Sequence, residues 1–322
     1  MARVKCLEIV VPGPLTTVQD RGRFGLGQYG VPPSGAVDPL SLRVGNLLVG
    51  NGENEACLEM TFMGPTIMSL RDTTIAVTGG DLQPVVNEKP LQMWRSHLLR
   101  RGDILSFKGA RSGCRAYLAV GGGISVPVIM GSKSTNLAAR FGGLEGRSLR
   151  KGDILYSDST GRHLQTEGIG FDSERWSPLY ARNKILRVVP GPHDDHFSPN
   201  AQERFFGASF AVTPQSDRTG IRLSGPRIEA KKGLMESILS EGVVPGAIQI
   251  PGDAQPIIIL VETVTGGYRK MATVISADLH LLGQLKPGDT VRFSSICVKE
   301  AYTVAREVEE MIQRFKKETG GA

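Results

Sequence analysis

Hydroxyl and charged side chains are concentrated in five short loop segments of this sequence. The cations of Arg21, Lys133 and Arg218 can hold carboxylates or phosphates. Serine and threonine hydroxyls and glycine amides can stabilise a developing oxyanion, and the carboxylates of Asp20 and Asp217 can carry protons. This combination is typical of a site for a small anionic or amide substrate. The five segments are Thr17–Arg21, Pro33–Asp38, Gly131–Thr135, Ser216–Arg218 and Thr265–Tyr268.

Each of these candidates also has a structural explanation. An Asp-Arg pair such as Asp20-Arg21 or Asp217-Arg218 often fixes a loop through an internal salt bridge. Asp38 precedes Pro39 and an apolar helical pattern, so a role as helix N-cap is favoured over a binding role. Ser34-Gly35 is compatible with an ordinary turn. Both explanations stay open for the two Asp-Arg pairs.

Three further motifs resemble nucleotide-binding or metal-binding signatures but lack parts of them. Gly25–Gly30 matches the letters of the dinucleotide fingerprint, yet its flanking residues are not those of a strand and a helix. Gly131–Thr135 has a serine where a Walker-type phosphate loop needs its second glycine. His193–His196 offers two imidazoles and two carboxylates without a third well-spaced ligand, so a solvated loop is favoured. We therefore expect no metal site.

The composition favours a small-molecule enzyme over a nucleic-acid-binding or membrane protein. The net charge is +6, from 38 Lys and Arg against 32 Asp and Glu, and the basic residues form no continuous stripe. No run approaches the roughly 20 apolar residues of a membrane helix, and the N-terminus lacks the apolar core of a signal peptide. The four cysteines are isolated, as is typical of free thiols in a reducing compartment. We expect a cytoplasmic protein with neither nucleic acid nor membrane as a partner.

Short apolar runs bounded by Gly, Pro or Asp predict a mainly β chain. Their spacing leaves no room for regular crossover helices, so closed or sandwiched antiparallel sheets are favoured over a parallel doubly wound sheet. Gly-Asp turns at 102–103, 152–153 and 288–289 precede apolar strands, and their aspartates are expected to bond their own backbone. The predicted strands are Val4–Val11, Thr74–Thr78, Ile104–Phe107, Arg115–Val120, Ile185–Val189, Ile257–Val261 and Val291–Ile296.

A repeated pentapeptide indicates that the architecture is doubled. Val-Val-Pro-Gly-Pro occurs at Val10–Pro14 and at Val188–Pro192, and an Asp-Arg pair follows each copy. A length of 322 residues suits two domains of roughly 150 residues. The apolar periodicity lapses near residues 161–182. We therefore predict a first domain over 1–160, a linker over 161–182 and a second domain over 183–322.

Three helices are predicted. The first begins after Asp38, with Pro39 at its first position, and stops at Gly50. The second is capped by Ser276 and stops before Pro287. The third runs from about residue 300 to 317 with one apolar face, and we expect that face to pack on a barrel end or on a partner subunit.

Eight motifs in order extend these loops over nearly the whole chain: Thr16–Arg23, Gly30–Asp38, Leu47–Asn51, Ala76–Asp81, Tyr117–Ile124, Gly131–Thr135, Ser216–Gly220 and Thr265–Tyr268. Together they resemble the biotin-dependent carboxyltransferase family, which holds allophanate hydrolase subunit 2, the C subunit of 5-oxoprolinase and Kip-type sporulation antagonists. The resemblance implies two cyclophilin-like β-barrels in tandem, with a few short helices and a C-terminal helix.

Position by position, the resemblance also implies a shared site. Two departures from the family pattern stand out: Lys133 replaces the usual arginine, which loses bidentate geometry, and Val261–Thr265 replaces a segment with an acid and an amide. These departures weigh against urea-type chemistry. The catalytic candidates are Asp20, Arg21, Asp217 and Arg218, and the substrate-binding candidates are Ser34, Gly35, Asp38, Ser132, Lys133, Thr135, Thr265, Gly266 and Tyr268.

The function implied by the resemblance is that of the C subunit of a 5-oxoprolinase-type complex. Such a complex opens 5-oxoproline to glutamate with ATP hydrolysis, and its partners are a Kip inhibitor-like B subunit and an A subunit. ATP, activating the lactam carbonyl, is then the expected cofactor. Two alternatives remain: a carboxyltransferase component of a urea or amide carboxylase, with biotin carried by another protein, and a non-enzymic antagonist that binds a Kip-type inhibitor.

Overall fold

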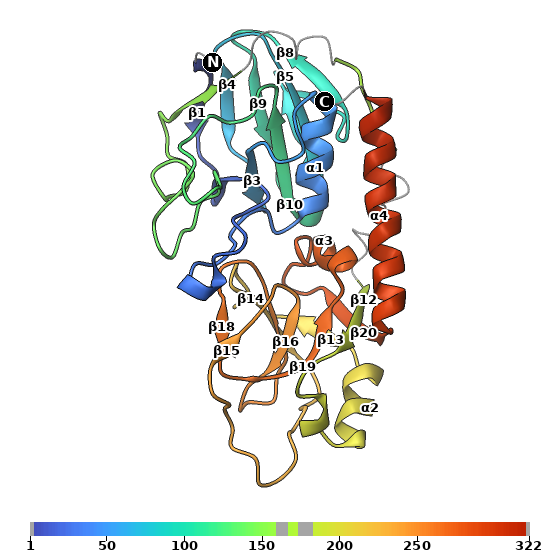
Figure 1. Cartoon of the computed structure of the whole chain (residues 1–322). Helices are drawn as coiled ribbons and strands as arrows, with labels where there is room; N and C mark the ends of the chain where they lie inside the picture. Colours follow the sequence, from blue (N-terminus) through green and yellow to red (C-terminus); the bar gives the residue numbers. More distant parts are fainter. Residues whose placement is uncertain (1–2, 159–166, 173–182, 320–322) are drawn as a thin grey trace. The chain divides into compact units, whose positions relative to one another are not determined.

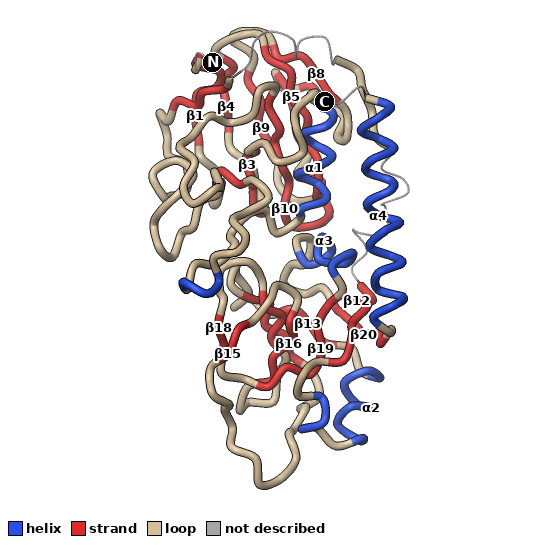
Figure 2. Tube along the Cα trace, viewed as in Figure 1, coloured by secondary structure: helices blue, strands red, loops and turns tan. Residues whose placement is uncertain are grey.

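The computed structural model describes residues 3–158, 167–172 and 183–319 (Figure 1). Strands and loops make up most of the described chain, as the tube in Figure 2 shows, and helices are few. The prediction of a mainly β chain is confirmed. Among the described helices, none is long and apolar enough to cross a membrane.

Unit 1, the first of two units, contains two antiparallel sheets around an apolar core. Its strands are β1 Val4–Val11, β2 Thr16–Gln19, β3 Cys57–Thr61, β4 Thr66–Ser69, β5 Thr73–Asp81, β6 Pro84–Val86, β7 Lys89–Pro90, β8 Ser96–Leu99, β9 Ile104–Phe107, β10 Ser112–Val120 and β11 Ile154–Ser157. One sheet has the order β11-β1-β4-β9-β6-β7 and the other β2-β3-β10-β5-β8. Side chains from both sheets, including Ile9, Ile67, Leu58 and Leu118, are fully buried in one cluster.

Unit 2 is built on a closed barrel of seven strands. Its strands are β12 Asn183–Pro190, β13 Phe210–Val212, β14 Gly220–Ser224, β15 Glu241–Gly242, β16 Ala247–Ile250, β17 Ile257–Ile259, β18 Thr265–Gly266, β19 Arg269–Val274 and β20 Thr290–Ser295. The barrel order is β12-β19-β16-β17-β14-β13-β20, and β15 pairs with β18 outside it. Within the barrel, β12 and β20 run parallel and the other described pairs are antiparallel. A closed barrel is thus found in unit 2, whereas the described strands of unit 1 form two separate sheets.

Helix α1 (Pro39–Leu48) begins where the sequence predicts. The Asp38 carboxylate accepts a hydrogen bond from the Ser41 N–H at 2.9 Å, which is the expected N-cap contact. The helix packs on β5 and β10 of unit 1 (Figure 1). The predicted cap at Ser276 is wrong, because Ser276 lies inside a 3-10 turn (η5, Ser276–Asp278) that leads into α3 (Leu279–Leu282) without a side-chain cap bond.

Helix α2 (Pro199–Gly207) is absent from the predicted elements. Its N-cap Ser198 accepts from the Ala201 N–H at 3.2 Å, and Pro199 occupies its first position. The same signal, a capping residue followed by proline, marks α1.

Helix α4 (Val298–Glu318) confirms the predicted last helix and begins with a reciprocal cap. The Cys297 N–H donates to Glu300 Oε2 at 2.8 Å, and the Glu300 N–H donates to Cys297 Sγ at 3.5 Å.

The three Gly-Asp turns have the predicted structural role. Each aspartate accepts a hydrogen bond from the backbone N–H three residues earlier, at 2.8 Å for Asp103, 2.7 Å for Asp153 and 3.2 Å for Asp289. The glycine before each aspartate has a φ of +91°, +85° or +86°, a region that other residues rarely adopt. Strands β9, β11 and β20 begin directly after these turns.

The division into units differs from the predicted domain boundaries at two places. Residues 24–33 are grouped with unit 2, and residues 311–322 are grouped with unit 1. Much of the predicted linker, 161–166 and 173–182, lies outside the described residues. Its described part belongs to unit 1: the Ser96 N–H donates to the Ile169 carbonyl at 2.8 Å.

Candidate functional site

Asp20 is buried, and its carboxylate organises the loop Gly131–Thr135. The side chain accepts hydrogen bonds from the Ser132 hydroxyl and the Lys133 backbone N–H, both at 2.6 Å. The Ser134 hydroxyl and the Gly22 N–H also donate to it. These four donors satisfy both oxygens of the carboxylate. Asp20 therefore holds two loops together, and in this arrangement its oxygens are engaged by the protein itself.

The segment Ser34–Asp38 packs directly against the loop that carries Asp20. The Ala36 N–H donates to the Asp20 carbonyl at 2.9 Å, and Asn136 Nδ2 donates to the Ser34 hydroxyl at 3.1 Å. Gly35 has a φ of +84°, and a Cβ there would lie 2.8 Å from the Arg21 backbone. A side chain at position 35 would therefore push the two loops apart. The predicted candidates of unit 1 are thus brought together by the fold.

Asp38 sits in a buried polar cluster that the sequence did not reveal. Its N–H donates to the Tyr117 hydroxyl at 2.8 Å, and that hydroxyl donates to Glu59 Oε2 at 2.7 Å. Both oxygens of the Asp38 carboxylate are occupied by Ser41, through the N–H at 2.9 Å and the hydroxyl at 2.6 Å. Burial, followed by the nearby carboxylates of Glu59 and Asp38, raises the pKa of Tyr117 well above its usual range. The cap role of Asp38 is the one that its contacts support.

The cationic candidates of unit 1 differ in exposure. Arg21 is exposed beside the buried Asp20. The Lys133 ammonium forms an ion pair with Glu55 Oε2 at 2.8 Å, while the Thr135 hydroxyl donates to the Val18 carbonyl at 2.9 Å. Arg21 is therefore the candidate cation most accessible to a ligand, and Thr135 serves the backbone of the loop.

In unit 2, Asp217 has the same local contact as Asp20. The Thr219 N–H donates to Asp217 Oδ1 at 2.7 Å, as the Gly22 N–H donates to Asp20 Oδ1 at 2.8 Å. Each aspartate thus accepts from the N–H two residues later, the pattern of an Asx turn. Asp217 is exposed, however, and lacks the shell of hydroxyl donors that surrounds Asp20. The repeated Asp-Arg motif gives the same turn in two different environments.

Arg218 forms a buried ion pair with Glu262. Arg218 Nε and Glu262 Oε1 lie 3.1 Å apart, and both side chains are almost fully shielded from water. Glu262 belongs to the segment Val261–Thr265, which departs from the family pattern. That segment therefore retains an acid, and the acid neutralises the guanidinium of the second Asp-Arg motif.

Thr265, Gly266 and Tyr268 lie on and beside the short strand β18. Gly266 pairs with Glu241 of β15, and the side chain of Tyr268 is partly exposed. The next residues along β19 lead into a group of charges that lies outside the predicted candidates. The candidates Thr265, Gly266 and Tyr268 therefore lie beside a cluster formed by Lys270 and its contacts.

Lys270 is buried and is the centre of this cluster. Its ammonium pairs with Glu241 and also donates to the Gly242 carbonyl at 3.3 Å. His193 Nε2 lies 3.4 Å from the same Glu241 oxygen, and the Lys270 N–H donates to His193 Nδ1 at 3.2 Å. The hydrogen bond from Lys270 lowers the pKa of Glu241, and burial lowers the pKa of His193.

The segment His193–His196 is more ordered than the predicted solvated loop. It forms a 3-10 turn (η4, Asp194–His196), and both imidazoles bond to β19. Arg269 Nε donates to His196 Nδ1 at 3.2 Å. Among the described residues, no group of three or more His, Cys, Asp or Glu side chains is arranged to hold a metal ion. The only sequence signal for this cluster was the proximity of two histidines to the second pentapeptide.

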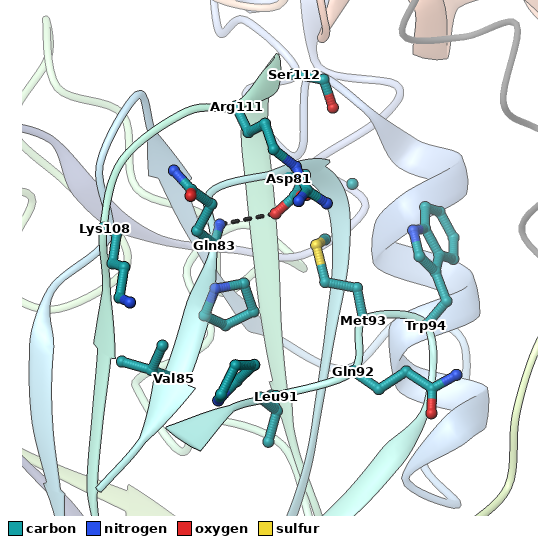
Figure 3. A pocket seen from close by; sticks show the side chains of 13 residues that line it. Asp81, Gln83, Val85, Leu91, Gln92, Met93, Trp94, Lys108, Arg111 and Ser112 are labelled. Atoms are coloured by element: carbon teal, nitrogen blue, oxygen red, sulfur yellow. Dashed lines mark hydrogen bonds and ion pairs between the residues drawn. The ribbon is translucent and has the colours of Figure 1, made fainter. Parts of the chain in front are cut away.

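Two pockets are lined by residues other than the predicted candidates. A pocket of about 510 Å³ in unit 1 has apolar walls that include Pro84, Leu91 and Met93, with Lys108 and the Arg111–Asp81 ion pair beside them (Figure 3). A second pocket, of about 280 Å³, lies in unit 2 beside the loop 227–236. None of the predicted candidates lines either pocket.

Comparison with known proteins gives one consistent result. Residues 29–295 match the model of the carboxyltransferase domain, subdomain A and B. The C subunit of 5-oxoprolinase from Escherichia coli is 36% identical over 312 residues, which cover 96% of this chain and 97% of that protein. Its counterpart from Haemophilus influenzae is 34% identical and is matched over 94% of each chain. The crystal structure of Kluyveromyces lactis urea amidolyase is 32% identical with a TM-score of 0.89, covering 98% of this chain but 20% of that one.

Proposed function

The chain belongs to the carboxyltransferase domain, subdomain A and B, family, and from that membership we propose that it acts as the C subunit of a 5-oxoprolinase-type complex. The observation that carries this proposal is collinearity. This chain aligns with nearly the full length of two proteins that are named as the C subunit of 5-oxoprolinase. Its match to urea amidolyase is confined to a fifth of that larger protein.

The proposed reaction is the ATP-dependent opening of 5-oxoproline to glutamate, in the company of a Kip inhibitor-like B subunit and an A subunit. ATP, bound with the partner subunit, would be converted to ADP and phosphate as it activates the lactam carbonyl; water would add to that carbon and the ring C–N bond would break, which leaves glutamate with a free amine. Exposed Arg21 suits the binding of an anionic substrate or phosphate. The buried Asp20 network holds the backbone on which Arg21 stands. The reaction takes place in the cytoplasm.

The test is reconstitution. The chain is mixed with its A and B partners, 5-oxoproline and ATP, and glutamate is measured with each component omitted in turn. We expect glutamate formation to require all three subunits and ATP. Glutamate formation that continues at the same rate without this chain would refute the proposal.

A pair of arginine variants separates a binding role from a structural one. Arg21→Gln removes an exposed cation at the candidate site, whereas Arg101→Gln removes an exposed cation from a turn elsewhere in unit 1. We expect Arg21→Gln to reduce glutamate formation at least tenfold, the effect of losing about 1.4 kcal/mol of binding to a charged group. Arg101→Gln should leave the rate unchanged, and both variants should keep the wild-type Tm.

A second candidate function is that of a biotin-dependent carboxyltransferase component. The observation in its favour is the TM-score of 0.89 to the urea amidolyase structure over 98% of this chain. In that case a biotin carrier on another protein supplies the carboxyl group. Transfer of labelled bicarbonate to urea or an amide, abolished by avidin, would support this function. Full activity of the reconstituted complex in the presence of avidin would exclude it.

A further inference from the structure

The side chain of Gln249 is buried, and its amide nitrogen lacks a hydrogen bond to the described part of the chain. Gln249 lies on β16 and is only 3% exposed. Its Nε2 has no hydrogen-bond partner among the described residues. A buried amide donor without a partner is costly, and native proteins keep such groups where a ligand or water satisfies them. The position of Gln249 therefore indicates a missing acceptor.

The amide lies next to the cluster centred on Lys270. Gln249 and Lys270 are direct partners in the antiparallel pairing of β16 and β19, so their Cβ atoms lie on the same side of the sheet, about 5 Å apart. A Cβ at Gly266 would lie 2.3 Å from Gln249 Nε2, so the backbone of β18 passes directly over the amide. Gly266 in turn pairs with Glu241, the counterion of Lys270.

The Glu241 carboxylate already forms an ion pair with the Lys270 ammonium, the cation of this cluster. The Lys270 side chain is 7% exposed, whereas the Glu241 side chain is 44% exposed and stands on the short, exposed strand β15. The Lys270 ammonium is thus held in a buried position, whereas its counterion Glu241 lies at the protein surface. Arg269, the next residue on β19, bonds instead to His196 Nδ1 and to the Met235 and Glu236 carbonyls, so Lys270 is the cation that pairs with Glu241.

We propose that Gln249 and Lys270 form a binding site for the carboxylate of a small ligand, and that Glu241 occupies this site as a replaceable internal carboxylate in the free chain. The ligand's carboxylate displaces that of Glu241 from the Lys270 ammonium and accepts the hydrogen bond that Gln249 Nε2 lacks. The ion pair between Glu241 and Lys270 shows that a carboxylate can bind the Lys270 ammonium. Gly266 leaves room for the amide, since any side chain there would displace it.

The identity of the ligand rests on the proposed function, although the site does not. 5-Oxoproline carries one carboxylate next to its lactam ring, and the product glutamate carries two. In the proposed complex, this site holds the substrate by its carboxylate and leaves the lactam carbonyl for activation elsewhere. Gln249 and Lys270 are then binding residues of the reaction.

The test follows the Gln249 side-chain amide by ¹⁵N NMR in the full chain, alone and with its B partner. Three probes separate the carboxylate of the substrate from its lactam: L-5-oxoproline, cyclopentanecarboxylate, which lacks the lactam, and 2-pyrrolidinone, which lacks the carboxylate. We expect the first two to shift the Gln249 signal with saturation and 2-pyrrolidinone to leave it in place. The signal is assigned by its disappearance in Gln249→Leu.

Two variants should change carboxylate affinity in opposite directions. Gln249→Leu should weaken the binding of cyclopentanecarboxylate about tenfold, because a charge-assisted hydrogen bond is lost. It should also raise the Tm of the free chain by about 2–4 °C, since an unbonded amide is replaced by an apolar group of similar size. Glu241→Gln should tighten binding, because the internal competitor loses its charge.

The matched control is Gln255→Leu, in the same unit. Gln255 exchanges hydrogen bonds with the Gly225 backbone at 2.8 and 3.2 Å, so its loss should lower the Tm and leave carboxylate binding unchanged.

Three outcomes would each overturn the proposal: saturable binding of 2-pyrrolidinone alone, absence of any shift with both carboxylates, or a Gln249→Leu variant that is less stable than wild type. If Gln249→Leu leaves glutamate formation unchanged, the proposed binding site is contradicted and the proposed function stands. If carboxylate binding depends on Gln249 but the chain supports no glutamate formation, the proposed function is contradicted and the binding site stands.

Discussion

Asp20 and Asp217 are equivalent in the sequence repeat but differ in their surroundings, and this difference can be measured. Asp20→Asn replaces an acceptor oxygen by a donor in a shell of four donors, so we expect a loss of about 3 kcal/mol in the free energy of unfolding. Asp217→Asn alters an exposed turn and should cost about 1 kcal/mol or less. Urea unfolding of both variants gives the comparison. Equal losses would mean that the buried shell contributes nothing.

His193 should make the stability of the chain depend on pH. Burial lowers its pKa, and the charges of Lys270, His196 and Arg269 act in the same direction, against that of Glu241. The unfolded chain therefore takes up a proton at His193 more readily than the folded chain, so stability decreases as the pH falls through the unfolded pKa of about 6.5. Urea unfolding at pH 7.5 and 5.5 measures the decrease. It should be smaller in His193→Gln, and an identical decrease in that variant would assign the effect to other groups.

At the scale of elements, a glycine of a Gly-Asp turn allows the energetic cost of backbone strain to be measured without a change in side-chain packing. Gly288 has a φ of +86° and nothing within 4 Å of a Cβ placed on it, so Gly288→Ala should cost about 1–2 kcal/mol through strain alone. Gly207, in α2 of the same unit, also has open space around it but lies in a helix. Gly207→Ala should therefore stabilise unit 2 by up to about 1 kcal/mol. Thermal unfolding of the two variants should show Tm shifts of opposite sign.

Elements with local signals could be predicted from the sequence. The cap at Asp38 and the Gly-Asp turns depend on residues within four positions of one another, and their contacts are as expected. The cluster of Lys270 with Glu241 and His193 could not be predicted, because 29 and 77 positions separate Lys270 from these partners. The pairing of β15 with β18 and of β12 with β19 brings these segments together.

At the scale of the whole molecule, the four cysteines should divide into one reactive thiol and three protected ones. Cys6, Cys57 and Cys114 are buried, and Cys297 is exposed at the start of α4. Burial raises the pKa of Cys6 to about 12, which suppresses its thiolate. Ellman's reagent should therefore react with one thiol per native chain and with all four after denaturation. Cys297→Ser should abolish the native reaction, and rapid labelling of further thiols in that variant would contradict the burial of the others.

The two copies of the sequence repeat have similar local backbone structure but different side-chain contacts. Both pentapeptides mark the end of a strand, β1 and β12, and both Asp-Arg motifs form the same turn. The partners differ: Asp20 is held by a serine-rich loop, and Arg218 is held by Glu262. The repeat therefore predicts where the loops lie, whereas the side chains that complete each site come from segments that are not repeated.

The assignment of α4 to both units has a consequence for synthesis of the chain. Residues from 311 onward are grouped with unit 1, where Ile312 and Phe315 are buried and the Phe315 ring meets Phe171 at a centroid distance of 4.8 Å. A ribosome adds these residues only after all of unit 2. At about 5–20 residues per second, the roughly 140 residues after Phe171 take about 7–30 s to be made. During that interval Phe171 has no partner from α4, so a nascent chain released early would expose an apolar surface that a chaperone can bind.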